Sequence, residues 1–205
     1  MIVSNIEKYK SIYTGNCLVI GHGESRGAFP ISKVQTYPKL LVNFYDPLYE
    51  NIIGIMCWDK DTLSFINKQL NGVENRPMIF TAGSTDMIPS YNFFIDPEKF
   101  PPRFNDEIKI FSGARAIYLA QYMGFENIYL IGFDFIPHKK GDENIYPMER
   151  ESIHYKDNPS GVHTGLKNQL KCFDNVKWIH TNIYQTNTNS LLINFEYKLP
   201  EELNG

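Results

Sequence analysis

Short runs of apolar residues recur along this chain, and most of them end at glycine, asparagine or aspartate. Runs of this kind, without regular alternation of apolar and polar positions, are typical of strands that are buried on both faces of a sheet. We expect strands in six of these runs, at 17–20, 40–42, 52–58, 77–81, 128–131 and 176–180. One more apolar run, 190–195, lies near the end of the chain.

The stretch 112–135 shows most clearly how helices separate these strands. Ser112 can cap a helix, apolar residues recur after it at helical spacing, and Gly124 suits the left-handed position that ends a helix. Strands that alternate with helices favour an α/β fold, Rossmann-like, with a mainly parallel sheet flanked by helices. Further helices are expected at 1–15, 62–70 and 161–173.

Two long segments have no clear period. Residues 86–107 are rich in proline, phenylalanine and asparagine, which favours an irregular connection. Residues 136–161 combine prolines, glycines and charges, and long loops of this composition are often lids. The length of 205 residues fits one domain, so we expect a single α/β domain over 1–205 with an irregular lid segment at 136–161.

Composition and charge bear on the partners and the compartment of this protein but do not indicate an activity. A net charge of −3 gives no sign of a nucleic-acid partner. Cysteines 17, 57 and 172 are widely spaced and odd in number, which favours free thiols in a reducing compartment. No run approaches the roughly 18 apolar residues of a transmembrane segment, and the first residues lack the apolar centre of a signal peptide. A cytoplasmic protein is the expectation.

The first predicted strand is followed at once by Gly21-x-Gly23-x-Ser25. A glycine-rich turn after a strand lets backbone amides approach a phosphate or a ribose. The spacing misses the dinucleotide fingerprint, and no Lys-Ser/Thr follows as it does in nucleotide-triphosphate loops. A tight turn that needs glycine only for its backbone angles is an equally good interpretation.

Polar side chains also follow several of the other predicted strands. Ser25, Asn43, Asp59 and Asp134 each come just after an apolar run, and the carboxyl ends of parallel strands form the ligand edge of such folds. Residues of these types are also common in turns and helix caps, so the repetition is the argument for function. No group of histidine, cysteine and carboxylate residues has the spacing of a metal site, and no Gly-x-Ser-x-Gly is present.

Several motifs, taken in order, resemble those of the bacterial sialyltransferase family that builds lipooligosaccharide caps. The family's first turn, Gly-Asn-Gly-Pro-Ser, is similar to 21–25, and an asparagine ends its next strand as Asn43 does here. The match is closest in the central block, where the family's Ser-Gly, helix and Gly-Ile-Asp-Phe are similar to 112–113 and 132–135. His-Tyr, a second histidine and Asn-Ser-Leu-Leu-x-Asn-Phe follow in the family's order, at 154–155, 163 and 189–195.

The resemblance implies a CMP-activated sugar donor of the sialic-acid type, a glycan acceptor, and an inverting transfer that needs neither metal nor cofactor. Carried over by position, the nucleotide-binding residues would be Gly21, Gly23, Ser25, Asn43, Asp59, Ser112, Gly113, Gly132 and Asp134. Among them, the resemblance implies that Ser25, Asn43, Ser112 and Gly113 contact the cytidine or its ribose, and that Gly132 and Asp134 line the same cleft. His163 takes the place of the general base that removes the acceptor's proton, a role that suits an imidazole. Lys109 stands where the family has an arginine before its Ser-Gly, and Tyr146 stands for one of two tyrosines that stabilise the departing phosphate.

Two other functions stay open at this point, and so does a homo-oligomeric state. A related family with a similar Ser/Gly, helix and Gly-x-Asp block transfers phosphoryl groups to pterin-like substrates, and Asp59 and Asp134 are then candidates for holding magnesium. The third function is that of a catalytically silent nucleotide-binding or assembly protein that keeps the fold.

Overall fold

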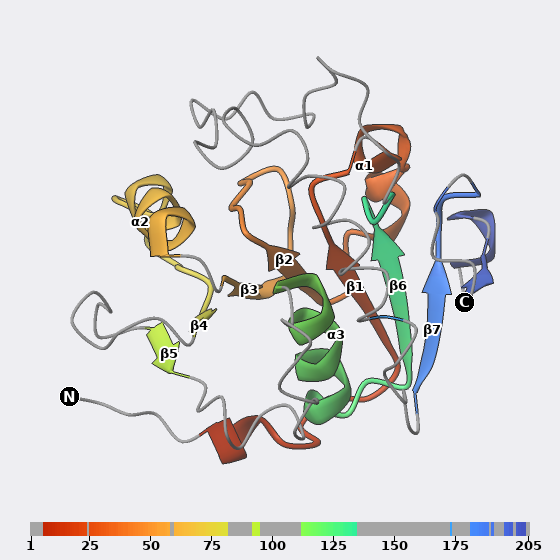
Figure 1. The fold of residues 1–205 in the computed structure, drawn as a ribbon, viewed down its shortest axis with the longest axis horizontal. Coiled ribbons are helices and arrows are strands. Elements are labelled where there is room, and N and C mark those ends of the chain that lie inside the picture. Colours follow the sequence, from red (N-terminus) through yellow and green to blue (C-terminus); the bar gives the residue numbers. More distant parts are fainter. Residues whose placement is uncertain are drawn as a thin grey trace, which may run out of the picture.

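The computed structural model describes residues 6–23, 25–57, 60–81, 92–94, 112–134, 173, 181–188, 190, 195–198 and 200–203. Within these residues the strands form one eight-stranded sheet of order β5-β4-β3-β2-β1-β6-β7-β8 (Figure 1). The strands are β1 (Asn16–Ile20), β2 (Lys39–Val42), β3 (Ile52–Met56), β4 (Ile79–Thr81), β5 (Asn92–Phe94), β6 (Asn127–Ile131), β7 (Asn182–Gln185) and β8 (Glu196–Tyr197). The helices are α1 (Ser25–Ala28), α2 (Lys60–Gln69) and α3 (Ser112–Met123), with short 3-10 turns η1 (Ile6–Tyr9), η2 (Ile31–Val34) and η4 (Pro200–Leu203).

Every pairing between neighbouring strands of this sheet is parallel. The chain runs outward from β1 to β5, then returns to the other side of β1 as β6 and continues outward to β8. The strand order therefore reverses between β1 and β6, and such a switch point is where open α/β sheets bind their ligands. The predicted α/β fold with a parallel sheet is confirmed.

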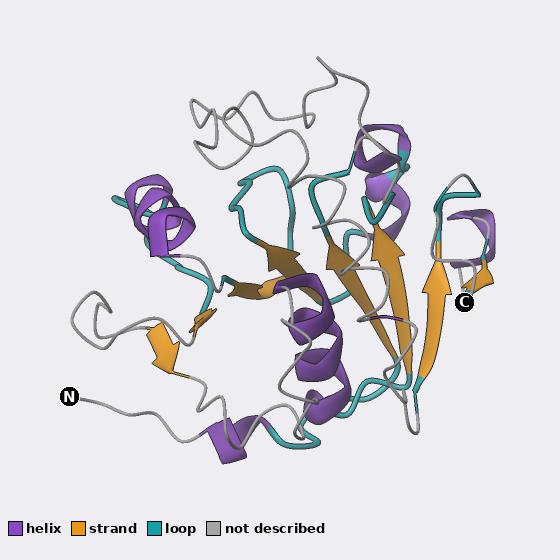
Figure 2. Cartoon of the chain, viewed as in Figure 1, coloured by secondary structure: helices purple, strands orange, loops and turns teal. Residues whose placement is uncertain are grey.

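Helices cover both faces of the sheet, which explains why its strands are continuously apolar (Figure 2). Cys17 and Val19 of β1 point to the face covered by α3, whose buried side chains include Ile117 and Ala120. Leu18 and Ile20 point to the opposite face, where they share a core with Phe29, Val34, Leu63 and Ile66 of α2, and Leu70 just after it. Side chains that alternate along β1 thus fill two cores.

The expected helix over 1–15 is wrong for residues 10–15. Within the described residues 6–15 the structure has only the 3-10 turn η1, and the residues after it cap the carboxyl end of α3 instead. The amides of Ser11 and Tyr13 donate to the carbonyls of Tyr122 and Met123 at 2.9 Å each. Because the last carbonyls of a helix need donors, this segment gains more by capping α3 than by continuing as a helix.

The irregular connection expected at 86–107 is also wrong in part, because Asn92–Phe94 pairs with β4 as the strand β5. The strand expected at 176–180 lies outside the described residues, as do the segment 136–161 and all of the helix expected at 161–173 except Phe173, which is helical. The described strand β7 begins at Asn182, just beyond the expected one. Gly124 has φ +101°, which confirms the left-handed end expected for α3.

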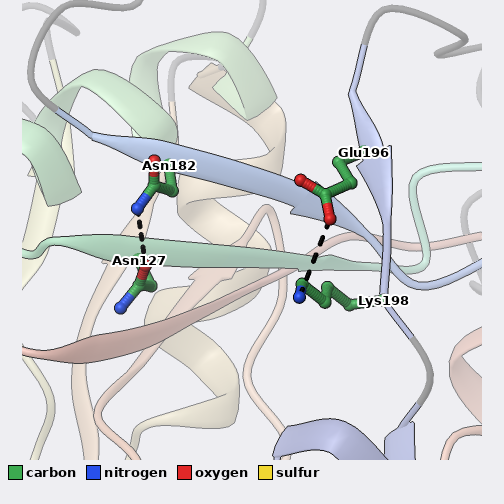
Figure 3. Close-up of polar contacts among 4 residues, drawn as sticks. All are labelled: Asn127, Asn182, Glu196 and Lys198. Atoms are coloured by element: carbon green, nitrogen blue, oxygen red, sulfur yellow. Dashed lines mark hydrogen bonds and ion pairs between the residues drawn. The ribbon is translucent and has the colours of Figure 1, made fainter.

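The amino edge of the sheet is held by an asparagine ladder across three strands. Asn182 Nδ2 donates to Asn127 Oδ1 at 3.0 Å (Figure 3). Asn127 Nδ2 donates in turn to Asn16 Oδ1, also at 3.0 Å. These residues are direct neighbours in the register of β1, β6 and β7. A slip by one residue would move every side chain to the other face, so the ladder and the two cores favour the same register.

A buried lysine lies at the same edge. Lys39 is fully buried, and its ammonium donates to the carbonyls of Val34 at 3.1 Å, Gln35 at 2.6 Å and Tyr37 at 2.8 Å. Three acceptors match the three N–H groups of an ammonium. Burial nevertheless lowers the pKa of Lys39 to about 8. The side chain therefore ties the end of η2 to the start of β2 at an electrostatic cost.

Candidate functional site

The carboxyl ends of β1 and β6 approach each other as closely as two backbones can. The amide of Gly21 donates to the carbonyl of Ile131, and that of Gly23 to the carbonyl of Gly132, both at 2.8 Å. A Cβ at Gly21 would lie 2.7 Å from the Gly132 oxygen, and a Cβ at Gly132 would lie 2.8 Å from the Gly21 oxygen. Gly132 also has φ +69°. Both glycines are needed because this contact leaves no room for a side chain.

Ser25 and Asp134 bind each other across the switch point. The backbone amide of Ser25 donates to Asp134 Oδ2 at 2.9 Å, and its hydroxyl donates to Asp134 Oδ1. Asn187, which follows β7, donates from Nδ2 to the same Oδ1 at 2.8 Å. Asp134 is buried, and Gly23 packs so tightly on it that a Cβ there would lie 2.5 Å from Oδ2. Three donors from two connections thus fix this carboxylate.

Asn43 follows β2 at the same edge of the sheet. Its backbone is left-handed, with φ +66°, and its amide donates to the carbonyl of Met56 at 2.9 Å. Its side-chain oxygen is buried and accepts no hydrogen bond from the residues that the structure describes. An unsatisfied buried acceptor costs about 1–3 kcal/mol, so Asn43 Oδ1 offers a hydrogen-bond position to a ligand hydroxyl or amine.

A basic and aromatic group lies beside Asn43. The guanidinium of Arg26 lies 4.3 Å from the ring centre of Phe44, and the His22 ring meets Phe44 edge-on at 4.8 Å. Arg26 is buried, and a buried cation–π contact contributes about 2 kcal/mol. Burial raises the pKa of Tyr49, and the positive charge of Arg26 opposes that rise. The helix α1, directly after the glycine-rich first turn, therefore carries a buried cation.

The amino terminus of α3 packs on the residue before Asp134. A Cβ at Gly113 would lie 2.8 Å from Cε1 of Phe133, so the helix begins in direct contact with this ring. Ser112 is buried at the same place. The hydroxyl of Ser190, after β7, donates to the Phe133 carbonyl at 2.6 Å. The start of α3 and the β7–β8 connection thus both reach the end of β6.

The sequence-predicted residues that the structure describes lie where they were expected, at the carboxyl edge of the sheet. Those that it brings into contact are Gly21, Gly23, Ser25, Gly132 and Asp134. The other candidates, Asp59, Lys109, Tyr146 and His163, lie outside the described residues. Arg26 and Asn187 were missed. The position of Arg26, directly after the glycine-rich turn, could have indicated that it belongs to the site. No feature of the neighbouring sequence indicates the same for Asn187.

The described part of the chain lacks two kinds of feature, a metal-binding cluster and a membrane-spanning helix. No three histidine, cysteine, aspartate or glutamate side chains gather there in a way that would hold a metal ion. None of its helices has both the length and the apolar character that crossing a membrane requires.

A scan against protein-family models finds no match, and neither does a search of the curated proteins. Solved structures do match. The sialyltransferase CstII from Campylobacter jejuni, in complex with cytidine-5'-monophosphate, is similar with a TM-score of 0.62 and 18% identity over 93% of this chain and 86% of that chain. The same enzyme in complex with the substrate analogue CMP-3FNeuAc is similar with a TM-score of 0.61 and 17% identity, over 93% of this chain and 88% of that chain.

A second enzyme gives the same result. The monofunctional α-2,3-sialyltransferase Cst-I from Campylobacter jejuni matches with a TM-score of 0.55 and 21% identity, over 93% of this chain and 82% of that chain. The parallel sheet, its flanking helices and the switch point between β1 and β6 therefore form the fold that these sialyltransferases have.

Proposed function

We propose that this chain is a glycosyltransferase that moves a sugar of the sialic-acid type from a CMP-activated donor to a glycan acceptor. The observation that carries the proposal is the polar carboxyl edge at the switch point between β1 and β6. Structures of the same fold have been determined with CMP, with a CMP-sugar analogue, and with a trisaccharide acceptor together with CMP. A ligand of that class fits the position and the chemistry of this edge.

The described residues divide into those that shape the edge and those that can bind. Gly21, Gly23 and Gly132 let the two backbones meet, and Asn43 offers a buried amide oxygen to a hydroxyl or amine of the nucleoside. The start of α3, at Ser112, supplies backbone amides and the positive end of a helix dipole, which favour an anionic group. A nucleotide has both parts, a hydrogen-bonding nucleoside and a charged phosphate.

Within this proposal His163 is the general base. It removes the proton of the acceptor hydroxyl as the anomeric carbon loses its phosphate, and the new bond forms on the opposite face, which inverts the configuration. A positioned base of this kind contributes about 10²–10⁴-fold to the rate. Lys109 and Tyr146 are proposed to stabilise the departing phosphate. The transfer is proposed to need no metal ion.

The alternative of magnesium-dependent phosphoryl transfer is less well supported by the geometry. It needs carboxylates that are available to the metal. Asp134, one of its two candidates, already accepts hydrogen bonds from Ser25 and Asn187 on both of its oxygens. These three hydrogen bonds direct most of the lone pairs of Asp134 at protein donors instead.

Calorimetry with CMP, CTP and ATP, each with and without magnesium, tests the proposal. Binding of CMP that EDTA does not change is the expected result, and binding of triphosphate only with magnesium would favour phosphoryl transfer. Turnover of CMP-sialic acid with a glycan acceptor, followed by NMR of the C3 protons beside the quaternary anomeric carbon, tests inversion. His163→Ala should keep CMP affinity and lose at least about a hundredfold in turnover. Unchanged turnover would remove His163 from the mechanism.

A further inference from the structure

The first turn holds a negative charge that belongs to the protein itself. In glycine-rich turns that bind phosphate, the amides at the start of the following helix point at the anion. Here the amide and the hydroxyl of Ser25 donate to the carboxylate of Asp134, and the tight approach of Gly23 closes the remaining space. The carboxylate therefore occupies the place that a phosphate would take in such a turn.

A third donor to this carboxylate comes from another part of the chain. Asn187 lies between β7 and β8 and donates from Nδ2 to Asp134 Oδ1 at 2.8 Å. The neighbouring hydroxyl of Thr186 donates to the carbonyl of Leu130 at 2.8 Å, and that of Ser190 donates to the carbonyl of Phe133 at 2.6 Å. These three bonds dock the β7–β8 connection on the end of β6, and only the one from Asn187 reaches the carboxylate.

We propose that Asp134 and Asn187 are positioning residues of the nucleotide site. Asp134 holds the Gly21–Ser25 turn in its binding shape through Ser25, and Asn187 fixes the carboxylate in the rotamer that does so. Because the carboxylate repels a phosphate, the turn receives the uncharged nucleoside, its ribose or base, and the phosphate lies elsewhere on the edge. The inference rests on the proposed function and adds how the protein holds the turn that the resemblance assigns to the cytidine or its ribose.

Asn187→Ala deletes one donor and leaves both bonds from Ser25 in place. The less constrained turn should bind both cytidine and CMP about fivefold to tenfold more weakly, the usual effect of losing one hydrogen bond. The two ligands should lose affinity by the same factor, because the turn contacts the part that they share. Calorimetry well below the melting temperature gives both dissociation constants, and thermal melts show that each variant is folded.

The matched control is Asn182→Ala, which deletes an amide hydrogen bond of 3.0 Å at the other end of the same strand, in the asparagine ladder. It should melt at a lower temperature than the wild type and bind both ligands as the wild type does. If Asn182→Ala weakens binding as much as Asn187→Ala, the effect is general loss of structure and the inference is wrong.

Three further outcomes separate the inference from the proposed function. A wild-type protein that binds CMP and cytidine, with an Asn187→Ala variant of equal affinity, overturns the inference and leaves the proposed function intact. A wild-type protein that binds neither ligand at millimolar concentration overturns the proposed function, and the inference falls with it. Loss of CMP affinity alone in Asn187→Ala would place the phosphate at this turn and contradict the inference.

Discussion

Gly23→Ala tests the closed contact between β1 and β6 directly. The added Cβ would lie 2.6 Å from the Gly132 carbonyl oxygen and 2.5 Å from Asp134 Oδ2. The first of these atoms is backbone and is held by the Gly23 amide at 2.8 Å, so it cannot move away without breaking that bond. Overpacking of a core typically costs about 1–3 kcal/mol, and we expect about 3 kcal/mol or more here because a hydrogen bond is lost as well.

For a chain of this size, about 3 kcal/mol lowers the melting temperature by about 6–12 °C. Urea unfolding measures the loss of free energy of unfolding, and calorimetry measures CMP binding on the folded variant. The control is Gly72→Ala, because Gly72 has φ +84° and open space around its Cβ position. It should cost about 1 kcal/mol of backbone strain and leave CMP affinity unchanged. A Gly23→Ala protein that melts within about 2 °C of the wild type and binds CMP normally would refute the close approach.

Three other predictions concern single side chains. Because the pKa of Lys39 is lowered in the folded state, the unfolded state binds more protons between pH 8 and 10.5. The free energy of unfolding of the wild type should therefore rise across this window by about 1–3 kcal/mol relative to that of Lys39→Met, as measured by urea unfolding. Lys33→Met, the control, should show no such difference. Asn43→Gly keeps the left-handed backbone without strain, so the variant should stay folded. It loses the buried Oδ1 and should bind CMP about tenfold more weakly in calorimetry, whereas equal affinity would show that Oδ1 contacts no ligand. Asp134→Asn removes a charge at nearly constant shape, so the ratio of CMP to cytidine affinity should rise at least about fivefold, and an unchanged ratio would exclude repulsion of the phosphate.

The layers of the fold could be predicted because both faces of the central strands are covered. A strand such as 128–131 is apolar throughout, and the helix before it carries its own start and stop signals in Ser112 and Gly124. The strand β5 was missed because three residues in a segment rich in proline and asparagine carry no period. Residues 10–15 were misjudged because their role depends on the carbonyls of α3, which are distant in the sequence.

The edge was predictable as a set of positions, but its contacts were not. Ser25 and Asp134 each follow an apolar run, so parallel pairing alone placed both at one edge. That they bind each other follows from the order of the strands, which puts β6 next to β1 although the two residues are 109 positions apart. Asn187 had no local signal, because an asparagine between threonines after a strand is typical of any turn.

The charges at this edge limit where the phosphate of the proposed donor can lie. At an effective dielectric constant of about 20, two unit charges separated by about 8–16 Å interact by about 1–2 kcal/mol, enough to direct a flexible ligand. The carboxylate of Asp134 repels the phosphate, whereas the amino terminus of α3 and the cation of Arg26 attract it. Arg26 is buried over Phe44 on the face opposite α3, so the two attractive features lie on different sides of the sheet edge. Of the two groups that the sequence allowed at the glycine turn, a phosphate or a ribose, these charges favour the ribose, and they direct the phosphate elsewhere on the edge.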